Sequence, residues 1–452
     1  MGNRAAIILA AGQGTRMRSS MPKVLHQVGG RAMVDWSVAL ARSVGCDKII
    51  VVCSPAGQAV QDHVSETLGA EAIAIQDPPL GTGHAVLAAK EALAGFEGDL
   101  VVLYGDTPLI PTDAVEALFH ELDAGAAVGV LGFDAADPGA YGRLVVDEKN
   151  NLDAIVEAKE ATPAQLSIRF CNSGVMAASA ETMFGLLDQV TNDNAKGEYY
   201  LTDIVGLARD AGQRCRAVAC DEADVLGVNS RVELAQAELA FQTRKRHAFL
   251  QSGVTMTAPD TVFFSFDTEI ENDVILEPGV VFAPGVHVRT GARVRAFSHL
   301  EGAHVAENCE IGPYVRLRPG TVLERGVKIG NFVEVKKTRM GAGAKANHLS
   351  YLGDGDVGAG ANIGAGTIFC NYDGFLKYQT TIGEGAFVGS NSALVAPVTI
   401  GAGAYVGSGS VITKDVEPDA LAVGRGRQMQ KPGWATTFRD KMAEIKAARK
   451  KG

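Results

Sequence analysis

A glycine-rich loop follows the first apolar run of the chain, in the stretch AIILAAGQGTRM. It contains Gly12, Gly14 and Arg16, and Lys23 follows shortly afterwards in the segment PKVLH. The loop is not a P-loop, and Met17 stands where a dinucleotide fingerprint would have its third glycine. Backbone N–H groups of such a turn can approach phosphate closely, while Arg and Lys supply positive charge. The pattern therefore indicates a phosphate site of another kind.

Two oxygen-bearing side chains could hold a metal ion beside this loop. Asp106 follows the apolar run DLVVLY, and Asn229 stands in the segment LGVNS. Carboxylate and amide oxygens are suitable ligands for Mg²⁺. An aspartate at the end of a strand is more often a capping residue, so the metal interpretation depends on the glycine-rich loop nearby.

A histidine in the second half could act as a base. His348 lies in the polar stretch KANHLSYLGD, before the segments NIGAGT and CNYDG. Imidazole titrates close to neutral pH and can accept a proton there. A lone histidine is more often structural or simply exposed, so the neighbouring segments carry the functional interpretation.

Short apolar runs alternate with helical patterns up to about residue 229. We expect strands at 5–10, 48–53 and 99–106, and helices at 32–45 and 81–95. This alternation predicts an α/β domain at 1–229, Rossmann-like, with a mostly parallel sheet covered on both faces. Ligands of such sheets bind at the carboxyl ends of the strands, where the glycine-rich loop and Asp106 both lie.

Residues 230–251 read as one long helix that links two domains. Ser230 can cap this helix, and Glu233 would complete a capping box.

Apolar residues then recur every six positions, from Ile270 through Leu276 and Phe282 to Ile412. A six-residue period indicates a parallel β-helix, here at 252–452, because neither a helix nor a hairpin sheet repeats at that interval. A glycine-rich flexible linker is the alternative interpretation. The segment CNYDGFLKYQTT interrupts the period, and the chain closes with a basic helical tail that is either solvated or contacts a neighbouring subunit or an acidic partner.

Composition excludes several classes of protein. The net charge of −10 argues against broad binding to nucleic acid or anionic membranes. The seven cysteines have no C-x-x-C spacing, which favours a reducing compartment without disulfides or structural zinc. No apolar stretch is long enough to predict a membrane span.

Further segments complete a resemblance to a known family. QDPPLGTGHA resembles a base-recognition segment of sugar-1-phosphate nucleotidyltransferases, and YGRLV, IVEAKEAT, CNSGVM and GEYYLTD resemble their sugar-binding segments. With the motifs around His348, nearly the whole chain resembles the bifunctional N-acetylglucosamine-1-phosphate uridyltransferase/glucosamine-1-phosphate acetyltransferase (GlmU) family. The resemblance implies a left-handed β-helix, a cytoplasmic homotrimer, and use of Mg²⁺, UTP and acetyl-CoA. It further implies synthesis of UDP-N-acetylglucosamine, a precursor for bacterial peptidoglycan and lipopolysaccharide.

The resemblance also assigns site residues. Arg16 and Lys23 would be catalytic in the N-terminal site, with Asp106 and Asn229 on the metal. Residues matching those that bind UTP and the sugar nucleotide are Leu9, Ala10, Ala11, Gly12, Lys23, Gln76, Gly81, Thr82, Tyr104, Gly105, Asp106, Gly142, Glu157, Asn172, Thr202 and Asn229.

In the C-terminal site, the resemblance makes His348 the general base for acetyl transfer. Arg318, Lys336, Tyr351 and Asn362 match contacts to the sugar phosphate. Matches on the acetyl-CoA side are Ala365, Asn371, Tyr372, Ser390, Ser408 and Arg425. Ser408 stands where some members have alanine, and Asn347 also departs from the family pattern.

Two other readings compete with this one. The chain could be a single-activity nucleotidyltransferase whose β-helix serves only assembly or allosteric control. It could also be a trimeric scaffold in which both sites are inactive.

Overall fold

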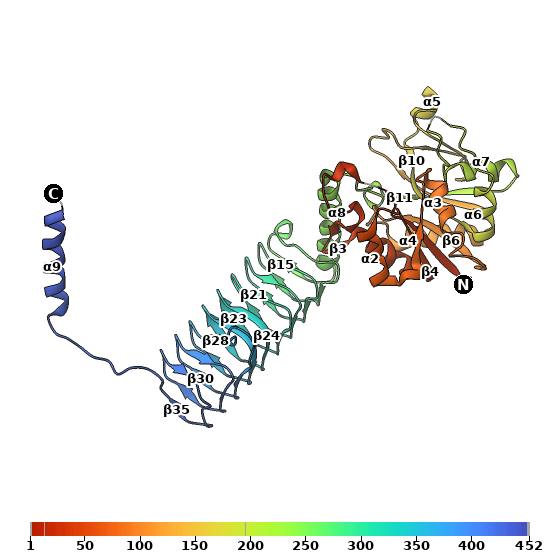
Figure 1. The fold of residues 1–452 in the computed structure, drawn as a ribbon. Coiled ribbons are helices and arrows are strands. Elements are labelled where there is room, and N and C mark those ends of the chain that lie inside the picture. The colour runs from red at the N-terminus through yellow and green to blue at the C-terminus, as the bar shows by residue number, and fades with distance from the viewer. Residues whose placement is uncertain (1, 13, 195, 450–452) are drawn as a thin grey trace. The chain divides into compact units, whose positions relative to one another are not determined.

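A computed structural model describes residues 2–12, 14–194 and 196–449 (Figure 1). The chain forms two compact units: Met1–Gln251 with Phe263–Asp267, and Ser252–Val262 with Thr268–Gly452. Within the described residues, no helix is long and apolar enough to cross a membrane.

The first unit is built on a mixed sheet with the strand order β11-β7-β10-β6-β1-β4-β5. Strands β4, β1, β6 and β5 are parallel neighbours, β11 is parallel to β7, and β10 runs antiparallel between β7 and β6. The strands are β1 (Arg4–Leu9), β4 (Cys46–Cys53), β5 (Ile73–Ile75), β6 (Asp99–Tyr104), β7 (Val128–Asp134), β10 (Phe170–Ser179) and β11 (Cys215–Cys220), with β8 (Arg143–Val146) and β9 (Leu152–Val156) at the side.

Both faces of this sheet are covered. Ala6 and Ile8 of β1 belong to one buried core, whereas Ala5 and Ile7 belong to the other. This explains the continuous apolar run of β1, because alternate side chains enter two different cores. The principal helices of the unit are α1 (Met33–Ser43), α2 (Gln58–Leu68), α3 (Thr82–Ala88), α4 (Thr112–Asp123), α6 (Ala180–Leu187) and α7 (Asp203–Asp210). Helix α3 stops seven residues short of the predicted end at 95, and turns follow it.

The long helix α8 (Arg231–Gln251) is grouped with the first unit, and the second unit begins directly after it at Ser252. Phe241 is buried in a cluster with Met17 and Met33, and its ring meets Trp36 edge to face. Ser230 Oγ accepts from Glu233 N at 3.4 Å, as the capping pattern predicts. The Glu233 carboxylate instead accepts from Asn229 N at 2.7 Å, one residue earlier than a capping box would place it.

The second unit is a parallel β-helix. The partner of Ile275 is Arg293 in the next coil, and Arg293 pairs in turn with Glu310, so one coil takes 17 or 18 residues. The predicted inward positions are buried throughout, for example Leu276, Val294 and Ile412. The six-residue period is therefore the period of one face of the coil.

Three faces result from this winding. One sheet contains β12 (Thr255–Met256), β14 (Ile275–Leu276), β17 (Arg293–Val294), β20 (Glu310–Ile311), β23 (Lys328–Asn331), β25 (Lys345–His348), β27 (Asn362–Ile363), β30 (Phe387–Val388), β33 (Tyr405–Val406) and β35 (Leu421–Ala422). The second face has β13 (Glu269–Ile270), β16 (His287–Val288), β19 (Ala303–Val305), β22 (Thr321–Leu323), β29 (Thr380–Ile382) and β32 (Val398–Ile400). The third has β15 (Val281–Phe282), β18 (His299–Leu300), β21 (Arg316–Leu317), β28 (Ile368–Cys370), β31 (Ala393–Val395) and β34 (Val411–Ile412), and the longer β24 (Glu334–Met340) and β26 (Tyr351–Val357) join both.

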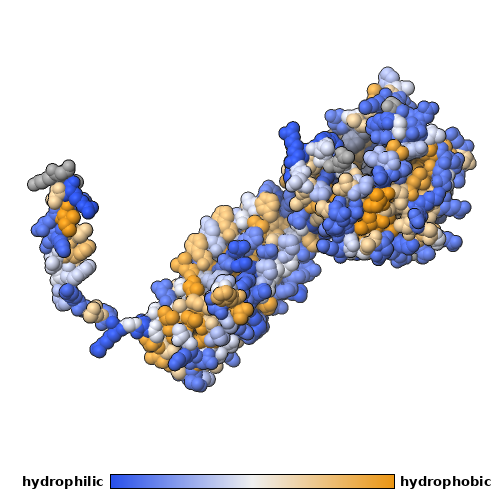
Figure 2. All heavy atoms as spheres, viewed as in Figure 1, coloured by the Kyte–Doolittle hydropathy of each residue, from blue (hydrophilic) through white to orange (hydrophobic). Residues whose placement is uncertain are grey.

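One corner of the β-helix carries a ladder of exposed rings. Phe297, Tyr314 and Phe332 have positive φ and stack at centroid distances of 5.2 and 5.4 Å. Figure 2 shows hydrophobic residues on the viewed face of this unit.

The interruption of the period forms a loop that leaves the coil after β28 and is closed by a bridge between Tyr372 and Lys377. The tail is helical in α9 (Trp434–Arg449), all of it exposed. Lys450 and Lys451 of the predicted basic tail lie outside the described residues.

Candidate functional site

A cavity of about 290 Å³ opens at the carboxyl ends of β1 and β6. The two ends are tied together because Gly105 N donates to the Leu9 carbonyl at 3.0 Å. The predicted nucleotide residues that line the cavity are Leu9, Ala10, Ala11, Gly12, Lys23, Gln76, Gly81, Thr82, Tyr104 and Asp106. Residues from four separate sequence segments therefore meet where an α/β sheet binds its ligands.

Lys23 joins the two predicted metal ligands. Its ammonium donates to the Asp106 carboxylate, and to Asn229 Oδ1 at 3.0 Å. Gly14 makes this approach possible: its φ is +60°, and a Cβ there would lie 2.5 Å from Lys23 Cβ. Any side chain at this position would be strained and would push Lys23 away.

The donor set fits a magnesium ion. Asp106 and Asn229 present two oxygens to one positive charge, as they would to a hard cation. No group of three or more His, Cys, Asp or Glu residues that could hold a metal occurs in the described part of the chain. Mg²⁺ commonly binds through one or two carboxylates with substrate phosphates completing its shell, so a larger cluster is not required.

The segment predicted to recognise the base lines the cavity and is held there by hydrogen bonds. Gln76 is buried, and its amide nitrogen donates to the Gly81 carbonyl at 2.9 Å. Thr82 Oγ1 accepts from Leu201 N at 3.1 Å, and this bond ties the segment to GEYYLTD. The two segments, more than a hundred residues apart in the chain, thus form one wall.

The predicted sugar residues form a second group. Asn172 N donates to the Gly142 carbonyl at 2.8 Å, and a Cβ on Gly142 would lie 3.5 Å from Glu157 Oε1. Burial raises the pKa of Glu157, and the Lys196 ammonium partly offsets this. Thr202 precedes α7 and lines a separate shallow hollow of about 380 Å³ with Ile155 and Asp203. Ile155 also lies against Gly142, since a Cβ on Gly142 would be 3.3 Å from Ile155 Cγ2, so this hollow adjoins the other predicted sugar residues.

The residues that line the cavity differ from the predicted ones in two ways: some were not predicted, and Arg16 was predicted but does not line it. Pro79, Ala85, Val24 and Glu198 also line it, and each lies within or beside a quoted motif. Arg16, predicted to be catalytic, is exposed on the short 3-10 helix Thr15–Met17 and does not line the cavity.

In the second unit, the predicted phosphate residues lie on successive coils. Arg318 donates to Glu334 Oε1 at 2.8 Å, and Glu334 pairs in register with Tyr351. Lys336 lies beside Lys377 of the inserted loop, and a side-chain hydrogen bond between them, followed by the like charge of Lys336, lowers the pKa of Lys377. Lys377 escaped sequence reasoning because it lies 41 positions from Lys336, on a loop outside the period.

One side-chain contact and one backbone hydrogen bond connect His348 to the two neighbouring coils. Its Nδ1 lies 2.8 Å from Asn331 Oδ1, and its carbonyl accepts from Gly366 N at 3.2 Å. Asn362 pairs in register with Lys345, at the start of the strand that carries His348.

Four of the predicted acetyl-CoA residues form a row along the axis of the β-helix, from one coil to the next. The Ala365 carbonyl accepts from Asn391 N at 2.7 Å, and the Ser390 carbonyl accepts from Gly409 N at 2.8 Å. The Ser408 carbonyl then accepts from Arg425 Nη1 at 2.6 Å.

The other two acetyl-CoA residues lie by the inserted loop. Asn371 donates from Nδ2 to the Asp354 carboxylate, and Tyr372 is exposed on the loop itself.

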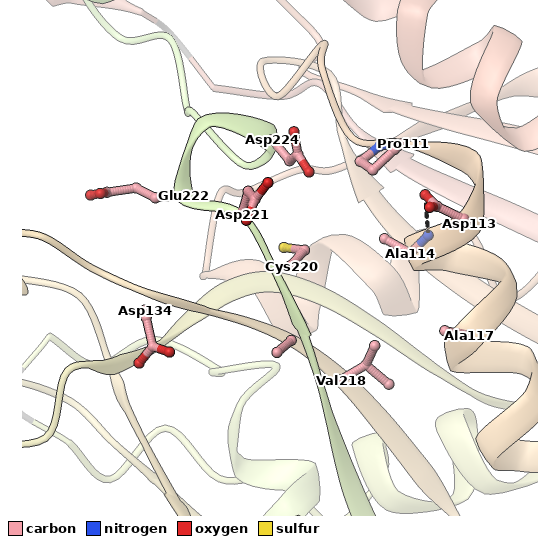
Figure 3. Close-up of a pocket in the computed structure, with 11 residues that line it drawn as sticks. Pro111, Asp113, Ala114, Ala117, Asp134, Val218, Cys220, Asp221, Glu222 and Asp224 are labelled. Atoms are coloured by element: carbon pink, nitrogen blue, oxygen red, sulfur yellow. Dashed lines mark hydrogen bonds between the residues drawn. The ribbon is translucent and has the colours of Figure 1, made fainter.

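A different cavity of the first unit, about 580 Å³, is lined by acidic side chains (Figure 3). Asp113 already accepts from Ala114 N at 2.9 Å, and Asp224 is paired with Arg244. Its five carboxylates would repel a triphosphate, which argues against this cavity as the nucleotide site.

Comparison with known proteins agrees with this division. A model for MobA-like NTP transferase domains matches residues 6–167, and one for the bacterial transferase hexapeptide (six repeats) matches 302–337 and 379–414. The second unit is thus a left-handed parallel β-helix of hexapeptide repeats. The chain is 64% identical to the bifunctional protein GlmU of Hyphomonas neptunium, over 99% of this chain and 97% of that one. It is 57% identical to that of Caulobacter vibrioides, over 96% and 94%, and 53% identical to that of Sphingopyxis alaskensis, over 99% of both.

Proposed function

Because this chain belongs to the family of bifunctional GlmU proteins, and therefore makes UDP-N-acetylglucosamine by two successive transfers, we propose which of its residues perform each transfer. It acetylates glucosamine 1-phosphate with acetyl-CoA and then transfers uridylyl from UTP, with Mg²⁺, to the product. Uridylyl transfer would take place in the 290 Å³ cavity and acetyl transfer at the coils around His348.

For uridylyl transfer, the observation that carries the proposal is the convergence of Lys23, Asp106 and Asn229 beside the glycine-rich loop. The phosphate of N-acetylglucosamine 1-phosphate attacks the α-phosphorus of UTP, and pyrophosphate leaves. Lys23 offsets negative charge as it develops, and the loop N–H groups orient the triphosphate. A bound Mg²⁺ supplies further neutralisation of phosphate charge. Arg16 would reach the phosphates from its exposed position at the rim.

We assign selection of the base and of the sugar to two separate groups of residues. Gln76, Gly81 and Thr82 would read uracil, since their amide, carbonyl and hydroxyl groups can donate and accept hydrogen bonds. Gly142, Glu157, Asn172 and Thr202 would hold the N-acetylglucosamine.

For acetyl transfer, His348 removes a proton from the amine as its nitrogen attacks the thioester carbon. Lys336, Lys377 and Arg318 would hold the sugar phosphate by charge. Tyr351 and Asn362 would contact the sugar, and the row Ala365, Ser390, Ser408 and Arg425, with Asn371 and Tyr372, would receive acetyl-CoA.

The protein is a homotrimer assembled through its β-helix. We place it in the cytoplasm, because its seven cysteines are all free thiols, as a reducing compartment favours. The functional boundaries are 1–229 for the uridyltransferase and 252–452 for the acetyltransferase.

A coupled assay tests this function. Glucosamine 1-phosphate, acetyl-CoA, UTP and Mg²⁺ together should give UDP-N-acetylglucosamine. Omitting acetyl-CoA should stop both steps, whereas omitting UTP should leave N-acetylglucosamine 1-phosphate to accumulate. A chain with a single activity would accumulate no acetylated sugar phosphate and would release pyrophosphate only when that sugar phosphate is supplied.

A further inference from the structure

His348 has a neighbour that can determine which of its ring nitrogens is free to act. Nδ1 lies 2.8 Å from Oδ1 of Asn331. The two residues are register partners on β23 and β25, so the bond joins adjacent coils. An imidazole that donates Nδ1–H to an amide oxygen carries its lone pair on Nε2.

The backbone around this pair leaves little room for other arrangements. A Cβ at Gly330 would lie 2.0 Å from the Asn347 carbonyl, so only glycine allows the two coils to approach this closely. The His348 carbonyl accepts from Ser350 Oγ at 2.9 Å and from Gly366 N at 3.2 Å. The main chain of His348 is therefore fixed, and Asn331 controls what remains free, the orientation of the ring.

We propose that Asn331 is the positioning residue for His348: its amide oxygen accepts the Nδ1–H and holds Nε2 as the base. This inference rests on the proposed function of His348. As the N–C bond forms, the amine proton passes to Nε2; the C–S bond then breaks, and coenzyme A leaves as a thiol with the proton from the imidazolium.

A neutral amide suits this position better than a carboxylate. In the proposed function, the phosphate of the substrate would lie close to Lys336 and Lys377, whose ammonium groups are neighbours. An aspartate partner for His348 would add negative charge beside an anionic substrate. An asparagine orients the ring without that repulsion.

The test compares three variants, all as the full-length trimer. Asn331→Leu removes the acceptor at similar volume, and Asn331→Asp keeps an acceptor oxygen. Asn272→Leu is the matched control, because Asn272 is exposed on the same β-helix and bonds only to the adjacent Asp273 among the contacts described. Uridylyl transfer and size-exclusion chromatography report whether each variant is folded.

Asn331→Leu should lower the kcat of acetyl transfer about tenfold to a hundredfold, the size of effect known when a metal-bound histidine loses the partner that orients it. Its KM values should change less than about twofold, since substrate contacts remain. Asn331→Asp should retain more of the kcat than Asn331→Leu, with a raised KM for glucosamine 1-phosphate, and Asn272→Leu should behave as the parent. Equal losses in Asn331→Asp and Asn331→Leu, or no loss in Asn331→Leu, would overturn the proposal.

A double variant shows whether Asn331 acts through His348. Combined with His348→Ala, Asn331→Leu should cause no further loss, because residues acting as one unit are not additive. A further loss would contradict the positioning role. If His348→Ala itself kept full acetyl transfer, the function proposed for His348 would fail; if only Asn331→Leu kept it, this inference alone would fail. Should Asn331→Leu not assemble, Asn331→Ala takes its place under the same criteria.

Discussion

The two candidate sites are built from the chain in opposite ways. In the nucleotide site, Lys23 contacts residues 83 and 206 positions away, which loops bring together at the ends of parallel strands. In the acetyltransferase site, His348 contacts Asn331 only 17 positions away, one coil earlier. The first site depends on the overall topology of a sheet, whereas the second depends on a coil that repeats.

This difference predicts how each site tolerates change. A substitution in a loop of the first unit should affect one function only, since its partners come from unrelated segments. A substitution in the β-helix acts on residues one coil before and one coil after it. We nevertheless expect that replacing a catalytic residue of one site will leave the reaction at the other site unchanged.

The largest effect should come from His348→Ala. Loss of the general base should lower the kcat of acetyl transfer about a hundredfold to ten-thousandfold, while uridylyl transfer stays at the parental rate. Separate assays of thiol release and pyrophosphate release measure the two reactions. Parental acetyl transfer in this variant would remove His348 from the mechanism.

Lys23→Ala should show the reverse pattern. Removing a charge that stabilises the transition state should cost uridylyl transfer about a hundredfold to a thousandfold, with acetyl transfer unaffected. Lys48→Ala is the control, since Lys48 is an exposed lysine of the same unit. A loss of acetyl transfer in Lys23→Ala would mean that the two sites are not independent.

Gly14→Ala should give a smaller loss of uridylyl transfer, about tenfold. The new Cβ would meet Lys23 Cβ at 2.5 Å and would occupy a left-handed conformation, which costs about 1–2 kcal/mol. Gly185→Ala in α6 is the control, because a Cβ there meets nothing within 4 Å. Gly14→Ala should also lower the midpoint of urea unfolding; an unchanged midpoint together with full activity would show that the loop can rearrange freely.

The smallest expected effect concerns alkaline stability. Burial raises the pKa of Cys46 and Cys220 to about 12, and that of Cys53 and Cys215 to about 11, all in the first unit. In the second unit only Cys309, at about 11, has a pKa raised this far among the described thiols. The unfolded thiols ionise near 9, so the stabilisation is complete below that pH and is lost as pH rises toward the folded pKa values.

Each such thiol then costs the fold up to about 1.4 kcal/mol per pH unit. The first unit should therefore lose more unfolding free energy than the β-helix between pH 8 and pH 10. Fluorescence of Trp36 in a Trp434→Phe variant follows the first unit in urea, and circular dichroism follows the β-helix. Equal losses in the two units would contradict this comparison.

Sequence reasoning succeeded where structure repeats locally. The six-residue period predicted the inward residues from Ile270 to Ile412, because each hexapeptide forms its own face. The glycine-rich loop, Asp106 and Gln76 were also predicted to belong together, and they line one cavity.

What sequence reasoning missed depends on tertiary contact. Asn331 pairs with His348 because the coil between them takes 17 residues. The coil before it takes 18, and the sequence does not show which length applies at each point. Lys377 reaches Lys336 through a loop that no period describes. Phe241 of α8 packs against Trp36, and the sequence pattern of the helix did not indicate this contact.

Mixing two inactive variants tests the central claim, two independent sites in one chain, most directly. His348→Ala and Lys23→Ala are each supplied with glucosamine 1-phosphate, acetyl-CoA, UTP and Mg²⁺, first separately and then together. Each alone should form almost no UDP-N-acetylglucosamine, and the mixture should form it readily, because one protein acetylates and the other transfers uridylyl. A mixture as inactive as its components would contradict the account.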